Sequence, residues 1–257
     1  MIVPSLVRSG NRILPTSTGT SRWVISAADA PLLEEIRGHD WERFASDPRA
    51  KEVLRVRRKR ACYVFESEST RRRYFIKVYR YEKLGTRLRY LIRRCQGEKE
   101  WFQGNEAIRR GMRMPEYIGL GERYAGLLKT ETYCISRYVD GLRDGEAWLR
   151  NPAAAKPFGG RSRFLRQLAA TFGAAVGRNH ELALYHREMK PSNLFLEIGE
   201  SGKLEIGFLD AKHITVRPQP SEAERTKNLV RTYRMWEAAI REQGIATKYI
   251  LRFLAAC

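Results

Sequence analysis

The sequence predicts an α+β chain of two parts, the first built mainly of strands and the second mainly of helices. Short β-prone runs gather between residues 53 and 79 and again between 117 and 138, as in an antiparallel sheet. Long segments with apolar residues on one helical face follow after residue 160, as in packed helices. The pattern changes near Asp140–Gly141, so two lobes are expected there.

The elements of the first part follow from periodicity and from turn residues. Proline and glycine among serine and threonine predict a flexible leader over residues 1–20. In chain order, we then expect a helix over Ala28–Phe44, strands over Val53–Val56, Ala61–Phe65 and Tyr74–Tyr79, a helix over Arg87–Arg110, and strands over Tyr117–Leu120, Leu127–Lys129 and Tyr133–Tyr138.

The second part begins with a long amphipathic helix over Arg163–Leu182, whose apolar residues recur at helical spacing. A hairpin follows, formed by Asn193–Glu197 and Lys203–Asp210 around a glycine-containing turn, and the tail over Glu222–Ala256 is helical again. We therefore expect a leader over 1–20, a first lobe over 21–140 and a second lobe over 141–257.

Charge is the most unusual feature of the composition. The 257 residues hold 48 Lys and Arg against 29 Asp and Glu, which gives a net charge of +19. Such an excess favours an anionic partner, and a solvated arginine-rich surface is the alternative. With 43% hydrophobic residues, a disordered chain is excluded, and so is a membrane-spanning one because every long apolar stretch is interrupted by charge.

The cysteines and the N-terminus indicate the compartment. Cys62, Cys95, Cys134 and Cys257 lie far apart with no CxxC pair, so neither a zinc site nor a disulfide framework is predicted. The first residues have no continuous apolar core of the kind a secretory signal needs. We expect a cytoplasmic protein.

Three elements in order point to phosphoryl transfer. The stretch from His186 to Asn193 follows the protein-kinase loop H-R-D-L-x-x-x-N, with the same spacing between its ends. Asp210 comes directly after a β-prone run, where kinases place a magnesium ligand. Lys77 lies near the end of the β-prone run Tyr74–Val78, which suits a lysine that pairs with phosphates. The three elements in this order indicate a kinase much more specifically than any one of them alone.

With these residues the chain resembles the lipopolysaccharide kinases, the Kdo/heptose kinase family of the protein-kinase-like superfamily. The resemblance covers roughly Ile36 to Trp236 and includes Lys77-Val78-Tyr79-Arg80, Glu100-Trp101 and Tyr138-Val139-Asp140-Gly141. It implies a two-lobed protein-kinase-like fold with a small antiparallel-sheet N-lobe and a short helical C-lobe. It also implies transfer of the ATP γ-phosphate to a Kdo or heptose hydroxyl of the lipopolysaccharide inner core.

The resemblance assigns the nucleotide contacts. Lys77 would contact the α- and β-phosphates of ATP, and an acid on the following helix would hold that lysine. Glu100 is our choice for this acid, with Glu98 and Glu106 as rivals. The adenine would contact the hinge over Ser136–Val139, which includes Ser136 and Tyr138, through backbone groups.

The resemblance also assigns the catalytic loop. Glu188 and Lys190 are the expected catalytic residues, with Lys190 next to the γ-phosphate. Asn193 and Asp210 would hold Mg²⁺ through hard oxygen ligands. His186 and His180 are expected to be structural.

The sequence departs from the family pattern in two main places. Glu188 stands where the family has aspartate, and a misplacement of about 1 Å can cost about 100-fold in rate. A nucleotide-binding pseudokinase or regulatory scaffold is therefore the alternative. Residues 53–66 contain no glycine, so the basic tip Arg57–Arg60 would replace a glycine-rich phosphate loop or would be a solvated turn.

The excess charge is concentrated over Arg71–Arg73 and Arg80–Arg94. An anionic glycolipid or lipopolysaccharide precursor, with peripheral contact to an anionic membrane surface, is the first expected partner. Nucleic acid comes second, because alternating arginine and tyrosine also suits phosphates and bases. The alternative to both partners is an exposed arginine-rich face that binds neither. We expect a monomer, located in the cytoplasm or on the inner face of the cytoplasmic membrane.

Overall fold

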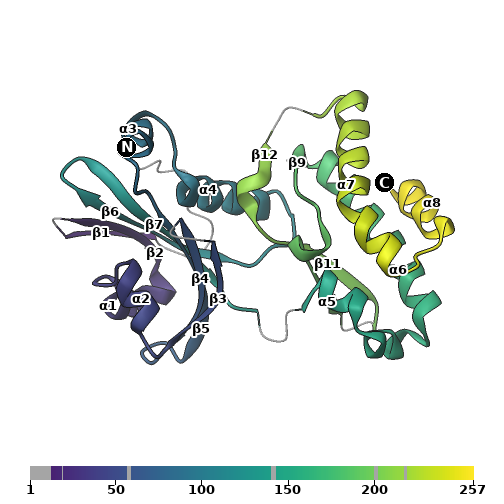
Figure 1. The fold of residues 1–257 in the computed structure, drawn as a ribbon, viewed down its shortest axis with the longest axis horizontal. Coiled ribbons are helices and arrows are strands. Elements are labelled where there is room, and N and C mark those ends of the chain that lie inside the picture. Colours follow the sequence, from purple (N-terminus) through teal and green to yellow (C-terminus); the bar gives the residue numbers. More distant parts are fainter. Residues whose placement is uncertain (1–12, 19, 57–58, 140–142, 200–201, 217–218) are drawn as a thin grey trace. The chain divides into compact units, whose positions relative to one another are not determined.

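In the computed structural model the described residues are 13–18, 20–56, 59–139, 143–199, 202–216 and 219–257 (Figure 1). The chain divides into two compact units. Unit 1 consists of Met1–Asn105 with Pro115–Tyr138, and unit 2 consists of Glu106–Met114 with Val139–Cys257. The lobe boundary expected at residue 140 lies outside the described residues and stays a prediction.

A seven-stranded antiparallel sheet in the order β1-β2-β6-β7-β5-β4-β3 forms the framework of unit 1 (Figure 1). Residues 13–18, expected within a flexible leader, instead form β1 and pair with β2. The runs expected over Leu127–Lys129 and Tyr133–Tyr138 are one strand, because the residues between them continue the pairing with both neighbours. The strands are β1 (Ile13–Thr18), β2 (Ser21–Ser26), β3 (Ala50–Val56), β4 (Arg60–Ser67), β5 (Arg72–Arg80), β6 (Tyr117–Ala125) and β7 (Leu128–Arg137).

The two faces of β5 have different neighbours. Ile76 and Val78 are fully buried in the main apolar core of unit 1, which also contains side chains of α1 (Ala30–Ile36) and α2 (Trp41–Ser46). Because successive side chains of a strand point to opposite faces, Lys77 belongs to the other face of the sheet. The alternation of β5 thus separates the structural core from the predicted phosphate-binding lysine.

The helix expected over Ala28–Phe44 is divided into α1 and α2. Asp40 begins α2, and its side chain accepts a hydrogen bond from the Arg43 N–H at 2.9 Å. An N-cap of this kind satisfies a free N–H group of the first helical turn. The apolar spacing continues through the break, so periodicity alone did not reveal it.

The helix expected over Arg87–Arg110 is also two helices, α3 (Leu84–Ile92) and α4 (Gln96–Arg109). The Cys95 N–H donates to the Glu98 carboxylate at 2.7 Å, which caps the start of α4. The Cys95 thiol is fully buried. The hydrogen bond and the buried thiol therefore hold the turn between α3 and α4.

Helices make up most of unit 2. Ser221 and Glu224 form a capping box at the start of α7, and Gly244 has a positive φ of 59° where the expected helical tail divides. Gly173 lies against the backbone of Phe253, so its missing side chain lets two helices approach closely. The helices are α5 (Gly145–Arg150), α6 (Arg161–Glu181), α7 (Glu222–Glu242) and α8 (Thr247–Ala256) (Figure 1).

Two small sheets complete unit 2. The expected hairpin is confirmed, since Leu194 pairs with Phe208 at the start of its register. The remaining strands are too short for sequence periodicity to reveal. The strands are β8 (Arg143–Asp144), β9 (Leu184–His186), β10 (Leu194–Ile198), β11 (Leu204–Phe208) and β12 (Ile214–Val216); β8 and β11 flank β10, and β9 pairs with β12. The predicted catalytic loop lies between β9 and β10 along the chain.

Among the described residues, no helix has both the length and the apolar character needed to cross a bilayer.

Candidate functional site

Lys77 and Glu100 form an ion pair in unit 1. Lys77 lies on β5 opposite Cys134 of β7, and Glu100 is a fully buried residue of α4. The Lys77 ammonium donates to Glu100 Oε1. The hydroxyls of Tyr79 and Tyr117 donate to the same carboxylate, at 2.5 and 3.4 Å. Three donors from two strands thus fix the position of the carboxylate, as a buried charge requires.

The two rival acids have other partners. Glu98 is 2.9 Å from the ammonium of Lys129. Glu106 binds the guanidinium of Arg109, and this hydrogen bond is the main cause that lowers the pKa of Glu106 to about 2. Of the three acids considered for the lysine of β5, Glu100 is the one that contacts it.

The predicted catalytic loop follows β9 in unit 2 and is fixed by internal hydrogen bonds. The Glu188 N–H donates to His186 Nδ1 at 3.1 Å, so the ring proton is on Nε2, which lies 3.1 Å from the Leu209 carbonyl. Burial lowers the pKa of His186 to about 4, and the ring is neutral at neutral pH. Asn193 Nδ2 donates to the Glu188 carbonyl at 2.9 Å. The expected structural role of His186 agrees with these contacts.

A second layer of hydrogen bonds holds this loop from α7. Asn228 Nδ2 donates to the His186 carbonyl at 2.9 Å, and Asn228 Oδ1 lies 2.9 Å from His180 Nε2. Trp236 Nε1 donates to the Met189 carbonyl at 2.8 Å. These positions of α7 were not singled out from the sequence, because only the folded chain places them next to a loop more than 35 residues earlier.

Glu188 and Asp210 lie together with His213, which the sequence analysis missed. His213 Nε2 is 3.3 Å from Glu188 Oε2 and 3.6 Å from Asp210 Oδ2. The Lys212 ammonium is 3.2 Å from the same Asp210 oxygen. Asp210 has a positive φ of 61°, an uncommon conformation for a residue with a side chain. The strained residue therefore belongs to a cluster of charged and ligating groups, where such strain is often found.

These donors suit a magnesium ion. One ligand atom each of Glu188, Asp210 and His213 lies within 4.8 Å of the others, and the two carboxylates supply hard oxygens. The amide nitrogen of Asn193 donates to the loop backbone, and the role of its amide oxygen as a metal ligand stays a prediction. Burial lowers the pKa of His213, so its imidazole is neutral at neutral pH. It therefore adds no positive charge next to the two carboxylates, and a metal cation would supply that charge.

The other predicted site residues are placed as follows. The Lys190 side chain is exposed. Ser136 is buried on β7, and the Tyr138 ring lies under the guanidinium of Arg73 at 4.9 Å. The tip expected at Arg57–Arg60 falls partly on residues 57 and 58, which lie outside the described residues. The roles of all of these in binding ATP stay predictions.

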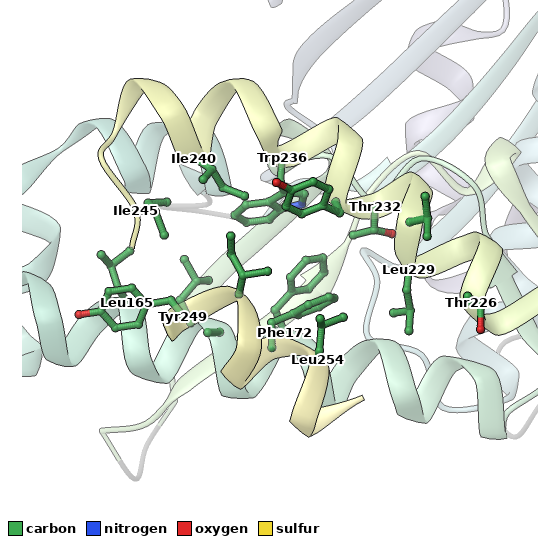
Figure 2. A pocket seen from close by; sticks show the side chains of 16 residues that line it. Leu165, Phe172, Thr226, Leu229, Thr232, Trp236, Ile240, Ile245, Tyr249 and Leu254 are labelled. Carbon is green, nitrogen blue, oxygen red and sulfur yellow. The ribbon is translucent and has the colours of Figure 1, made fainter. Parts of the chain in front are cut away.

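Unit 2 also contains an apolar cavity of about 320 Å³. Its walls come from α6, α7 and α8, and Figure 2 shows their side chains around a common space. Phe172 of α6, Trp236 of α7 and Tyr249 of α8 contribute aromatic rings. Nearly all of the lining is aliphatic or aromatic, so the cavity suits an apolar ligand better than a nucleotide.

Comparison with known proteins gives three findings. The lipopolysaccharide kinase (Kdo/WaaP) family matches residues 42–256. A solved structure described as WaaP in complex with acyl carrier protein has a TM-score of 0.62 and 17% identity, and the alignment covers 91% of this chain and 88% of that one. The BubR1 kinase domain gives a TM-score of 0.45 and 12% identity, over 84% of this chain and 54% of that one.

No curated protein sequence matches this chain. The likeness to the first solved structure extends over nearly the whole chain and shows a shared fold. The expected kinase-like α+β class is thereby confirmed.

Proposed function

Because the chain belongs to the lipopolysaccharide kinase (Kdo/WaaP) family, we propose that it transfers the γ-phosphate of ATP to a Kdo or heptose hydroxyl of the lipopolysaccharide inner core. That the chain is a kinase follows from the family, and the acceptor is the proposal. The family match over residues 42–256 carries it. The Lys77–Glu100 ion pair and the carboxylates of Glu188 and Asp210 support it.

The ion pair of unit 1 prepares Lys77 for an anionic ligand. Glu100 accepts a hydrogen bond from the ammonium and so holds it in a defined place, where it would contact the α- and β-phosphates of ATP. The buried carboxylate also keeps a side chain of high entropy ordered before the nucleotide arrives. Positioning of this kind is the main task of a protein that catalyses phosphoryl transfer.

The acceptor hydroxyl is the attacking group. Its oxygen bonds to the γ-phosphorus, the bond from that phosphorus to the β,γ-bridging oxygen breaks, and ADP leaves. The hydroxyl proton passes to the carboxylate of Glu188, which later releases it to water. Asn193 and Asp210 would hold Mg²⁺ through their side-chain oxygens, and the ion would supply positive charge next to the phosphates.

The substitution of glutamate for aspartate at position 188 has a structural counterpart. The longer side chain carries its carboxylate further from the backbone, and His213 Nε2 contacts it at 3.3 Å. This contact restricts a side chain that otherwise has more freedom than aspartate. We therefore keep transfer as the first reading. The pseudokinase is the second, because Glu188 is the one acid of the loop that departs from the family pattern.

The deciding experiment measures transfer and binding separately. The purified protein is incubated with labelled ATP, Mg²⁺ and lipid A bearing Kdo or heptose, and ATP binding is measured by calorimetry in parallel. The variants are Asp210→Asn and Glu188→Gln. Glu237→Gln is the matched control, since that acid pairs with Arg241 on the exposed side of α7.

We expect transfer by the wild type and by the control. Both site variants should lose at least about 100-fold, the usual contribution of a general base or an electrostatic group. Magnesium-dependent binding of ATP without transfer to either sugar would overturn the proposed acceptors, and absence of transfer to any acceptor would favour the pseudokinase. Absence of ATP binding would overturn both readings.

An acyl carrier protein is a second proposed partner. The solved relative was found in complex with an acyl carrier protein, and this chain has an apolar cavity of about 320 Å³ in unit 2. An acyl chain attached to such a carrier protein would be an apolar ligand, which suits the lining of the cavity.

Acyl dependence tests this partner. The affinity of this protein is measured for carrier protein with and without a long acyl chain. The test variant is Leu254→Gln at the cavity wall, and the control is Leu251→Gln on the same helix outside the cavity. Both side chains are largely exposed, so neither change should unfold the protein. We expect the acyl chain to raise affinity and Leu254→Gln alone to reduce that gain. Equal affinity with and without the chain would exclude the cavity as its site.

A further inference from the structure

The helix α3 exposes its apolar side. A surface helix of a folded protein normally turns its apolar residues toward the core, yet α3 has no buried residue at all. Four aliphatic side chains form its outer row and are largely exposed: Leu84 (60%), Leu88 (49%), Leu91 (54%) and Ile92 (85%).

Two residues of α3 contact Tyr81 and hold the helix in place. The Tyr90 ring packs edge-on against Tyr81, with centroids 4.7 Å apart, and Arg87 Nε donates to the Tyr81 carbonyl at 2.5 Å. In a helix of 3.6 residues per turn, Tyr90 lies about 160° from Leu88. The tyrosine pair thus holds the side of α3 opposite Leu88, and the aliphatic row is left exposed.

Basic residues surround this row. Residues 80–94 contain six Lys and Arg and a single acid, Glu82. Arg89 and Arg93 are exposed, and among the described residues neither has a carboxylate partner. The surface thus combines an aliphatic row with cations that remain available to an anionic partner.

This combination selects among the possible partners. A second copy of the chain would bring a like-charged surface against the first, which electrostatic repulsion opposes. Nucleic acid would use the cations and aromatic rings for stacking but would leave the aliphatic row in water. An anionic lipid surface accepts both, since acyl chains take the aliphatic side chains and headgroups take the guanidinium groups.

We propose that α3 is a membrane-docking helix that lies in the headgroup region of an anionic leaflet. With nine residues it is about 14 Å long, far shorter than a membrane span, so it lies along the surface. The inference rests on the proposed function only for the choice of membrane, because lipid binding needs neither ATP nor an acceptor sugar.

Vesicle binding tests the proposal. The full-length protein is sedimented with vesicles of phosphatidylcholine, alone or with about one third phosphatidylglycerol to supply the anionic surface. One variant removes the apolar row (Leu88→Gln with Leu91→Gln), and a second removes charge (Arg89→Gln with Arg93→Gln). Glutamine is a good helix former, so α3 is retained.

Matched controls lie outside α3. Val53→Thr with Ile198→Thr removes two exposed aliphatic groups from strands, and Arg231→Gln with Arg234→Gln removes two exposed cations from α7. Circular dichroism and thermal unfolding confirm that all variants are folded.

We expect binding to anionic vesicles only, unchanged in both controls. The charge variant should bind about 30-fold more weakly, since a basic residue near an anionic surface contributes about 1 kcal/mol and a tenfold change corresponds to about 1.4 kcal/mol. The apolar variant should also bind more weakly, and its loss should persist at high salt, where electrostatic attraction is screened.

Three results would overturn the proposal. The first is equal vesicle binding by all variants. The second is weaker binding by the charge variant with unchanged binding by the apolar variant. The third is a dimeric wild type and a monomeric apolar variant in sedimentation analysis. The last would show that a second copy covers α3. Transfer to a detergent-dispersed acceptor should be the same for both α3 variants, so failure of docking and failure of the kinase proposal are separate observations.

Discussion

Removal of the Glu100 charge should destabilise the protein far more than removal of the charge of its rival Glu106. In Glu100→Gln, the Lys77 ammonium keeps its place in the sheet but loses the negative charge of the Glu100 carboxylate next to it. The side chain of Lys77 is only 14% exposed, so little water can replace the lost partner. Breaking a buried ion pair on one side typically costs about 3–5 kcal/mol. The glutamine oxygen still accepts from Tyr79, and we therefore expect the lower end, about 3 kcal/mol.

The double variant makes the reasoning testable. Lys77→Met leaves the fully buried carboxylate of Glu100 uncompensated, and a cost near 4 kcal/mol is expected. With both charges removed, neither group is left unpaired. The double variant should therefore be more stable than the sum of the single effects by at least about 2 kcal/mol.

Hydrogen exchange of the amides of β5 and α4, measured over a series of urea concentrations, gives the free energy of unfolding of the unit that holds the ion pair. Glu106→Gln is the control, because that acid pairs with arginines on the surface. It should cost no more than about 1 kcal/mol. A Glu100→Gln variant within about 1 kcal/mol of the wild type, or additive single effects, would refute the assignment of a coupled buried pair.

Three further outcomes are expected. Burial holds the pKa of His186 at about 4, below the value of about 6.5 in an unfolded chain. Between these pH values the unfolded state binds more protons than the folded state, so the free energy of unfolding should fall by up to about 3 kcal/mol as the pH drops from 6.5 to 4. Urea unfolding at each pH should show a flatter dependence for His186→Gln. Asn228→Ala leaves the His186 carbonyl and the His180 ring without a partner and should lower the free energy of unfolding by about 2–3 kcal/mol; an unchanged urea midpoint would contradict this. Gly207→Ala places a methyl group against the Phe195 ring and should cost about 1–3 kcal/mol in thermal unfolding, whereas an unchanged melting temperature would show that the ring moves freely.

The sequence predicted the elements that alternation or helical spacing marks over many residues. It joined α3 to α4 because the apolar spacing runs through Cys95 without interruption. The cap that divides them, from the Cys95 N–H to the Glu98 side chain, is a local hydrogen bond that periodicity does not record. Strands of two or three residues, such as β9 and β12, are likewise below the length at which alternation is visible.

Within the candidate site, spacing identified the loop from His186 to Asn193 and the following Asp210, because that motif is local in sequence. It offered three acids for Lys77 and could not distinguish them, since the contact depends on how α4 lies against the sheet. His213 was missed because no motif places a histidine three residues after the aspartate. Its contact with Glu188 becomes visible only when the loop is folded.

Trp236 has two neighbours that connect separate parts of unit 2. Its ring forms part of the wall of the apolar cavity, and its indole N–H holds the backbone carbonyl of Met189 next to Glu188. A guest molecule that rotates or shifts this ring must lengthen or break that hydrogen bond. The filling of the cavity and the position of the backbone beside Glu188 are therefore linked through one side chain.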